Sequence, residues 1–242
     1  MSCGLQQYDS QVARMATKLV VGLGQGLLLR QCRHAVGAQL VTKIAADAQL
    51  KWQLFPLLAA YVAVYQRAAD SGTTILLFPC VPYNITGVVC GAAVRRFGVR
   101  PSDVTLIHDD LDVKVGAVKW RHQGSSGGNG VRSCIQSLGS DCFSRVRIGI
   151  GRPTTNERRA IVSYVLGDIP SDDMEKIQRA FAHAGIAQIL LDNHEPHRVG
   201  KQPSAMCTTR IPSVPWYTCA LEMLLAHIAS VQVLVRLLMG RL

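Results

Sequence analysis

The sequence predicts one α/β domain, built as a mixed twisted sheet flanked by helices and followed by an apolar C-terminal extension. Runs of β-branched residues alternate with segments whose apolar residues recur at helical spacing, which is typical of a sheet covered by helices. The chain has 242 residues, of which 48% are hydrophobic and 17% charged, so it can bury a sizeable core. We expect an N-terminal extension over residues 1–17, the domain over 18–192, a linker over 193–215 and a helical tail over 216–242.

Hydrophobic periodicity sets the expected elements in the first half of the domain. Val36, Leu40 and Ile44 fall on one stripe at helical spacing. Two later runs are rich in β-branched and aromatic residues, which favours strands. The expected elements are a strand from Lys18 that ends in a glycine turn, a helix over 34–48, strands over 52–66 and 73–79, and a helix over 85–97.

The second half continues the alternation and ends in a long periodic helix. In the run over 144–151, Val146 and Ile148 face one way while Arg145 and Arg147 face the other, as expected of a strand. A small-residue loop over 124–130 is expected to open a helix. The expected elements are a strand from Val104, a turn at Gly116, a segment over 117–121, a helix over 131–138, the strand over 144–151 and a helix over 172–191.

The tail differs in character from the domain. Residues 194–215 are polar and broken by prolines, and residues 219–239 are almost uniformly apolar. Glu222 and Arg236 interrupt the apolar run, and each charge costs about 2.5–3.5 kcal/mol inside a bilayer. A helix packed on the domain or lying at a membrane surface is therefore favoured over a membrane span, and an unstructured tail is the remaining alternative.

Net charge and cysteine usage limit the functional class. The formal net charge is +10, which favours a polyanionic partner such as nucleic acid or an anionic membrane surface. None of the eight cysteines forms a CxxC pair, which is typical of reduced intracellular thiols and not of a zinc site. The N-terminal segment has no apolar signal core, so we expect a cytoplasmic or mitochondrial protein that is not secreted.

Three kinds of site compete for the polar residues. A dinucleotide fingerprint, as in an NAD-dependent oxidoreductase, is suggested by Gly22, Gly24 and Gly26, but the third glycine of GxGxxG is missing because position 27 is Leu. The second is a metal site, for which the sequence offers no His-x-x-x-His pair. Its candidate ligands are His34, His108, Asp109, Asp110 and Asp112.

The third kind is a metal-free hydrolytic site. Asp109 follows the strand from Val104, and His34 follows the glycine turn after the first strand. If these two strand ends are adjacent, the carboxylate fixes the imidazole tautomer and leaves the other nitrogen to take a proton from water. Asn84 and Asn129 each stand where a helix follows a loop, so their amides could bind a peptide. His108 and Asp110 are then strand-end and turn residues.

A run of cations follows the acidic cluster, with little acid between its members. Such a patch supplies salt-dependent affinity for phosphates without reading bases. Its members are Lys119, Arg121, Arg132, Arg145, Arg147 and Arg152.

Five motifs, in order, resemble the bacterial-type peptidyl-tRNA hydrolase family over residues 18–192. They are VVGLGQG…CRHAVG (21–37), PYNITG (82–87), VTLIHDDLDVKVG (104–116), GSSGGNGVRS (124–133) and RVRIGIGRP (145–153). The resemblance implies an enzyme that cleaves the ester between a peptide and the 3′ ribose of tRNA, with no metal, no cofactor and no obligate protein partner.

The resemblance also implies roles for individual residues. His34 is the general base, Asp109 holds it, and Asn84 and Asn129 bind the peptidyl end and position water. Other family positions that contact substrate are occupied here by Gln25, Leu29 and Pro82. The tRNA 5′-phosphate is bound at Lys119 and Arg147, with Arg121 and Arg145 beside them.

The chain departs from the family pattern at several of these positions. Gln25 stands where the family has asparagine, the residue after His34 is Ala35 instead of asparagine, and the loop over 124–130 is one residue shorter and lacks the family histidine. These differences keep an alternative open, in which a hydrolase-like fold binds RNA with weak or no catalysis.

Overall fold

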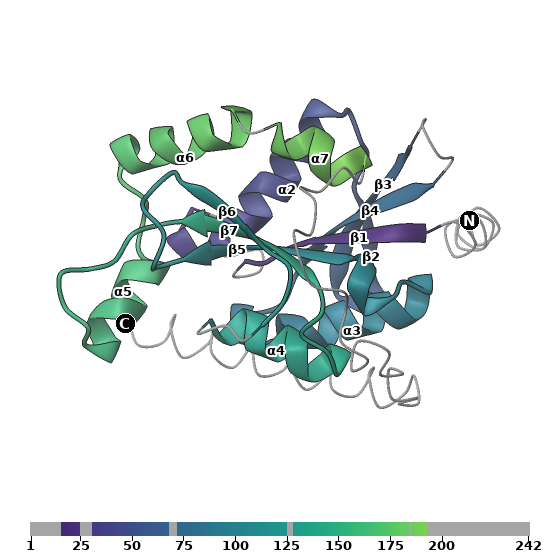
Figure 1. Ribbon diagram of the computed structural model, residues 1–242, viewed down its shortest axis with the longest axis horizontal. Helices are drawn as coiled ribbons and strands as arrows, with labels where there is room; N and C mark the ends of the chain where they lie inside the picture. Colours follow the sequence, from purple (N-terminus) through teal and green to yellow (C-terminus); the bar gives the residue numbers. More distant parts are fainter. Residues whose placement is uncertain (1–15, 25–30, 68–71, 125–127, 184, 193–242) are drawn as a thin grey trace, which may run out of the picture.

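The computed structural model of the protein describes residues 16–24, 31–67, 72–124, 128–183 and 185–192. These residues form one seven-stranded sheet in the order β2-β3-β4-β1-β5-β7-β6. Its central strands β4, β1, β5 and β7 are parallel, and antiparallel strands continue the sheet at both edges (Figure 1). The strands are β1 (Ala16–Gly22), β2 (Gln53–Phe55), β3 (Ala60–Gln66), β4 (Thr73–Pro79), β5 (Val104–Asp110), β6 (Val118–Arg121) and β7 (Ser144–Gly149).

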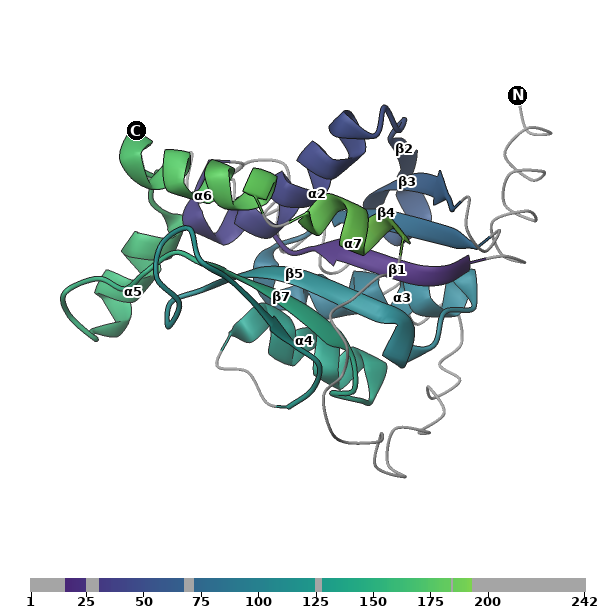
Figure 2. The same ribbon diagram turned by 45° about the horizontal axis from the view of Figure 1, so that its top comes forward.

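Helices cover both faces of the sheet, which confirms the predicted α/β class. One core lies between the sheet and α3 and α4, and a second lies between the opposite face and α2, α6 and α7 (Figures 1 and 2). The helices are α2 (Val36–Asp47), α3 (Thr86–Phe97), α4 (Asn129–Leu138), α5 (Arg158–Leu166), α6 (Ser171–His183) and α7 (Ile186–Asp192). Short 3-10 helices are η1 (Arg33–Ala35), η2 (Pro56–Leu58), η3 (Tyr83–Ile85) and η4 (Pro101–Asp103).

Two predicted elements are each divided in the structure, for local backbone reasons. The strand expected over 52–66 is wrong as one element, because Pro56 has no amide hydrogen to give to a ladder and Ala59 adopts a left-handed φ of 47°. The turn they make separates β2 from β3. The helix expected over 172–191 is interrupted by Gly185, whose φ is +54°, so it forms α6 and α7.

The crossover from β1 to α2 brings two strand ends to the same edge of the sheet. β1 and β5 are parallel neighbours, and Gly22, the last residue of β1, pairs with Ile107 three residues before the end of β5. Gly37 in α2 lies against this edge, where a Cβ would stand 2.2 Å from the carbonyl oxygen of Ile107. Only glycine permits so close an approach, which places the start of α2 directly over the end of β5.

The described residues contain no helix that is long and apolar enough to cross a membrane. The predicted linker and tail lie outside the described residues, and β1 begins two residues before the predicted domain start. Among the described cysteines, those at positions 32, 80, 90 and 134 form no disulfide.

Candidate active site

The predicted pair of His34 and Asp109 meets at the carboxyl edge of β1 and β5. His34 Nδ1 lies 2.7 Å from Asp109 Oδ2, and the two side chains are 21% and 4% exposed. A carboxylate oxygen accepts, so the imidazole donates its proton from Nδ1 and keeps a lone pair on Nε2. The pair therefore joins a buried acid to a partly exposed base with one nitrogen free to take a proton.

Arg33 anchors the short helix that carries His34. Its guanidinium donates to the carbonyl oxygens of Tyr164 (3.1 Å) and Asp168 (3.0 Å), and it stacks 3.9 Å from the centre of the Tyr164 ring. The Tyr164 hydroxyl donates to the carbonyl oxygen of Ile150 at 2.6 Å. Because Tyr164 belongs to α5, an element that the sequence did not predict holds η1 in place.

Tyr83 stacks on His34 and is a site residue that sequence reasoning missed. The two ring centres are 4.1 Å apart, the ring planes differ by 8°, and Tyr83 is 1% exposed. Burial, reinforced by the charge of Asp109, raises the pKa of Tyr83 well above its usual value, so its hydroxyl stays protonated. The only sequence signal was an aromatic residue directly before Asn84.

The two predicted asparagines are exposed on elements that contact each other. Asn84 lies in η3 and Asn129 begins α4, where its Oδ1 accepts from Arg132 at 2.8 Å. The amide of Gly87 donates to Ser133 Oγ at 3.1 Å and joins the two helices that follow these asparagines. Pro82 precedes η3 and is half-buried, whereas Gln25 and Leu29 lie outside the described residues.

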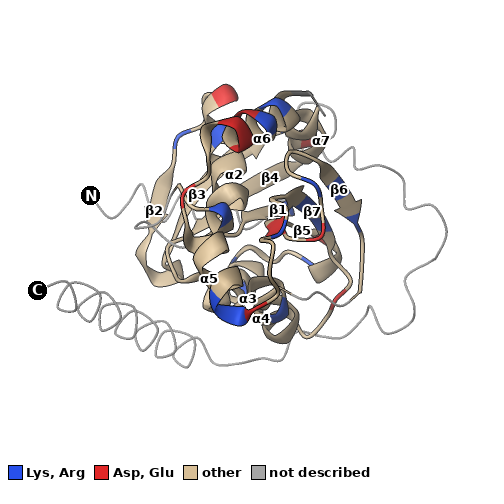
Figure 3. Cartoon of the chain, turned by 90° about the vertical axis from the view of Figure 1, so that its left-hand side faces the viewer, with Lys and Arg blue, Asp and Glu red and all other residues tan. Residues whose placement is uncertain are grey.

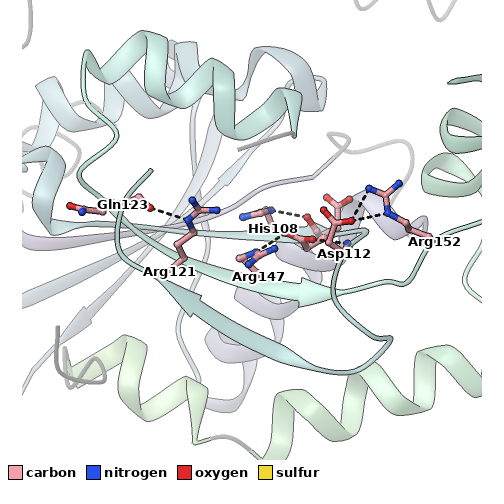
Figure 4. A network of polar contacts seen from close by, with 8 residues as sticks. His108, Asp112, Arg121, Gln123, Arg147 and Arg152 are labelled. Carbon is pink, nitrogen blue, oxygen red and sulfur yellow. Dashed lines mark hydrogen bonds and ion pairs between the residues drawn. The ribbon is translucent and has the colours of Figure 1, made fainter. Parts of the chain in front are cut away.

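The remaining members of the acidic cluster have separate partners. His108 is buried and its Nδ1 donates to the carbonyl oxygen of Asp109 at 2.7 Å. Burial lowers the pKa of His108, which favours the neutral imidazole. Asp112 pairs with Arg152 at 2.7 Å, as Figure 4 shows. These pairs occupy the side chains that the metal hypothesis required, and no candidate metal cluster is found within the described ranges.

Asp110 forms an ion pair with Arg147 beside the dyad. Arg147 Nε lies 2.7 Å from Asp110 Oδ2, and the amide of Asp112 donates to the other carboxylate oxygen at 2.8 Å. Burial acts to raise the pKa of Asp110, but the bonds from Arg147 and Asp112 outweigh it and the pKa is lowered. Asp110 therefore holds Arg147 on the sheet, next to the edge that carries His34 and Asp109.

The four predicted phosphate-binding cations share one face of β6 and β7. Lys119 pairs with Arg147 and Arg121 pairs with Arg145 across the antiparallel ladder (Figure 3). Lys119 and Arg121 are exposed and Arg147 is half-buried. Arg145 differs, because it is 1% exposed and lies 4.8 Å from the centre of the Phe143 ring.

The burial of Arg145 changes its expected role. Burial, helped by the charge of Arg121, lowers the pKa of Arg145 to about 10, which still leaves it protonated at neutral pH. Its Nη2 donates to the carbonyl oxygen of Asp141 at 3.2 Å. A guanidinium under the surface cannot contact a phosphate directly, so Arg145 supports the patch through its charge.

Comparison with known proteins identifies the family. The model of the family described as peptidyl-tRNA hydrolase matches residues 19–202. The chain belongs to the peptidyl-tRNA hydrolase family. A peptidyl-tRNA hydrolase of Lactiplantibacillus plantarum is 33% identical over 165 residues, which are 67% of this chain and 86% of that protein. One of Staphylococcus aureus is 32% identical over 172 residues, which are 70% of this chain and 88% of that protein.

A solved structure supports the same assignment. The crystal structure of peptidyl-tRNA hydrolase from Acinetobacter baumannii matches with a TM-score of 0.66 and 26% identity, over 74% of this chain and 90% of that one. Membership of this family does not favour the dinucleotide hypothesis. The structure also gives Gly22, the first glycine of that motif, a different role. A Cβ on Gly22 would lie 2.6 Å from the carbonyl oxygen of Gly37, so this glycine serves the packing of α2 on β1.

Proposed function

We propose that the chain hydrolyses the ester between a peptide, or an N-blocked amino acid, and the 3′ ribose of tRNA, with His34 as the general base. The observation that carries this proposal is the 2.7 Å hydrogen bond from His34 Nδ1 to Asp109 Oδ2. It fixes the tautomer whose Nε2 can accept a proton, on a side chain that solvent reaches. Family membership supplies the substrate class.

The reaction requires two proton transfers at one nitrogen. His34 Nε2 takes a proton from water while the water oxygen attacks the ester carbonyl carbon, and Asp109 stabilises the imidazolium that forms. The tetrahedral intermediate then collapses and breaks the bond to the ribose 3′ oxygen, which receives the proton back from Nε2. This sequence releases a free peptide carboxylate and intact tRNA, and it contains no step that requires a metal.

The groups around the dyad fit the two halves of this substrate. We assign the exposed amides of Asn84 and Asn129 to the binding of peptide groups and to the positioning of the water. We assign tRNA phosphate contacts to Lys119, Arg121 and Arg147, with Arg145 as the buried supporting charge. On the resemblance we also assign substrate contacts to Gln25, Leu29 and Pro82.

Peptidyl-tRNA arises where ribosomes work, so we propose a cytoplasmic or mitochondrial site of action. We also propose that the enzyme acts without an obligate protein partner. Contact of the residue 216–242 tail with a membrane is the less favoured alternative.

The test is release of an N-blocked amino acid from tRNA by the purified full-length protein, with EDTA present. We expect turnover for the wild type, and a loss of about 10²–10⁴-fold for His34→Ala, the usual contribution of a general base. His122→Ala is the matched control, because His122 bonds Ser144 Oγ at 3.1 Å, at the start of β7 and so at the opposite end of the strands from Asp109. Full activity of His34→Ala, or loss of wild-type activity to EDTA, would contradict the mechanism. Salt-dependent binding of tRNA without product would support the RNA-binding alternative.

A further inference from the structure

The contact between Tyr83 and His34 bears on how the general base is held. A hydrogen bond from Nδ1 to Asp109 fixes one edge of the imidazole but leaves the ring free to turn about that bond. Tyr83 covers one face of the imidazole, with ring centres 4.1 Å apart and planes 8° from parallel. The stacked ring removes the remaining rotation, because any turn would drive the imidazole into the phenol ring.

Tyr83 can act in this way because its own position is fixed from three directions. It is 1% exposed within the core shared with α3 and α4. The Thr86 hydroxyl donates to its carbonyl oxygen at 2.9 Å. Gly130 lies against the phenol ring, where a Cβ would come within 2.6 Å of Cε1. A side chain packed in this way keeps its rotamer and transfers its rigidity to the group stacked on it.

The same residue connects the elements that carry the other polar groups. Tyr83 directly precedes Asn84 in η3, and Gly130 directly follows Asn129 in α4. The Tyr83 ring therefore contacts His34 and packs against the first turn of α4. Its displacement would change the position of His34 relative to the groups that bind the peptide.

We propose that Tyr83 is a positioning residue, whose ring face sets the orientation of the His34 imidazole for proton transfer. This inference rests on the proposed function of His34 as a general base. The stacked ring carries the role, since it is the ring that contacts the imidazole, whereas the hydroxyl interacts with the carboxylate of Asp109. Misorientation of a catalytic group by about 1 Å can cost on the order of 10²-fold in rate.

Three variants separate the ring from the hydroxyl and from general damage to the core. Tyr83→Leu removes the ring, and we expect kcat to fall about 10–100-fold while KM changes less than about twofold. Tyr83→Phe keeps the ring, and we expect it to retain kcat within about threefold. Phe97→Leu is the matched control, because Phe97 is equally buried in the same core, at the end of α3 that is farther from Tyr83. It should lose stability without losing kcat.

A second readout does not depend on turnover. In protein labelled with ¹³C at histidine Cε1, NMR relaxation reports the mobility of the His34 ring, and we expect it to be low in the wild type and Tyr83→Phe but high in Tyr83→Leu. An ordered His34 ring or an unchanged kcat in Tyr83→Leu would overturn the inference, as would an equal loss of kcat in Phe97→Leu. Wild-type protein without turnover would instead contradict the proposed function, and the relaxation measurement would still decide the positioning role.

Discussion

Two consecutive residues of β5, His108 and Asp109, show how the pleat of a strand separates roles. Asp109 bonds His34, whereas the adjacent His108 points to the other face and is buried. Its Nδ1 donates to a backbone carbonyl, and its Nε2 has no hydrogen-bond partner among the described residues. A neutral imidazole tolerates this environment, but a charged one does not.

The buried His108 should therefore make stability depend on pH. Because burial lowers the folded-state pKa of His108 below its usual 6.5, the unfolded chain binds more protons below pH 6.5. Its contribution is fully present above pH 6.5 and is lost as pH falls through the folded-state pKa. His108→Asn keeps a donor near Nδ1 and cannot titrate, so the free energy of unfolding should fall less steeply between pH 7 and 5. One proton accounts for at most about 1.4 kcal/mol per pH unit. Urea unfolding across this range checks this, and identical slopes would contradict it.

The sequence was sufficient to predict which residues form the dyad, but not what holds them. His34 follows β1 and Asp109 lies at the carboxyl end of β5, and neighbouring parallel strands bring such residues to one edge. Arg33 and Tyr83 act through contacts with residues far away in the chain, so local patterns carry no sign of them. Arg145 was expected to face outward with Arg147, but it is buried and its guanidinium lies over the Phe143 ring.

At the scale of elements, the contact of α3 with α4 places Asn129 next to η3. Gly87 in α3 faces α4, and a Cβ there would lie 2.0 Å from the carbonyl oxygen of Ser133. Gly91, one turn later, is less tightly packed, with 3.2 Å from a Cβ to the carbonyl oxygen of Ser137. Substitution of each glycine by alanine therefore tests how closely α3 and α4 must approach, with a severe clash at position 87 and a mild one at position 91.

We expect Gly87→Ala to destabilise the protein and Gly91→Ala to be nearly neutral. The new methyl group at position 87 must push α4 away, and such overpacking typically costs about 1–3 kcal/mol. At position 91 the gain in helix propensity of about 1 kcal/mol offsets a tight contact. Because α4 carries Asn129, only Gly87→Ala should also raise KM. Urea unfolding and steady-state kinetics measure both effects, and equal effects of the two substitutions would show that the approach is not limiting.

Most elements could be predicted from periodicity, and the exceptions have physical reasons. α3 begins within one residue of its predicted start and ends at the predicted residue. Its apolar stripe and the glycine that follows it are both clear in the sequence. α5 was missed because only Val165 among its residues is buried, so it has only a weak apolar stripe, and it is held by the Arg33 contacts instead. The break at Pro56 was visible in the sequence and should have divided the strand over 52–66.

At the scale of the whole molecule, several cations share the sheet face where the tRNA is proposed to bind. The chain carries a formal net charge of +10. The exposed Lys119 and Arg121 lie on the same sheet face as Arg147. This face adjoins the edge that carries the dyad, since Asp110 follows Asp109 and bonds Arg147. Exposed cations at this place would attract the tRNA backbone without selecting a sequence, as the proposed function requires.

Neutralising this face should weaken tRNA binding and reduce its salt dependence. We expect Lys119→Gln combined with Arg121→Gln to lower the affinity for N-blocked aminoacyl-tRNA and to reduce the slope of log affinity against log salt by about two, because two cations no longer bind phosphates. The measurement is made in a His34→Ala background, so that the substrate remains intact. The control is Lys43→Gln combined with Lys51→Gln, which removes the same charge from α2 and the residues after it, on the opposite side of the sheet. If both double variants change the slope equally, the binding is non-specific attraction to net charge and the assigned phosphate site is wrong.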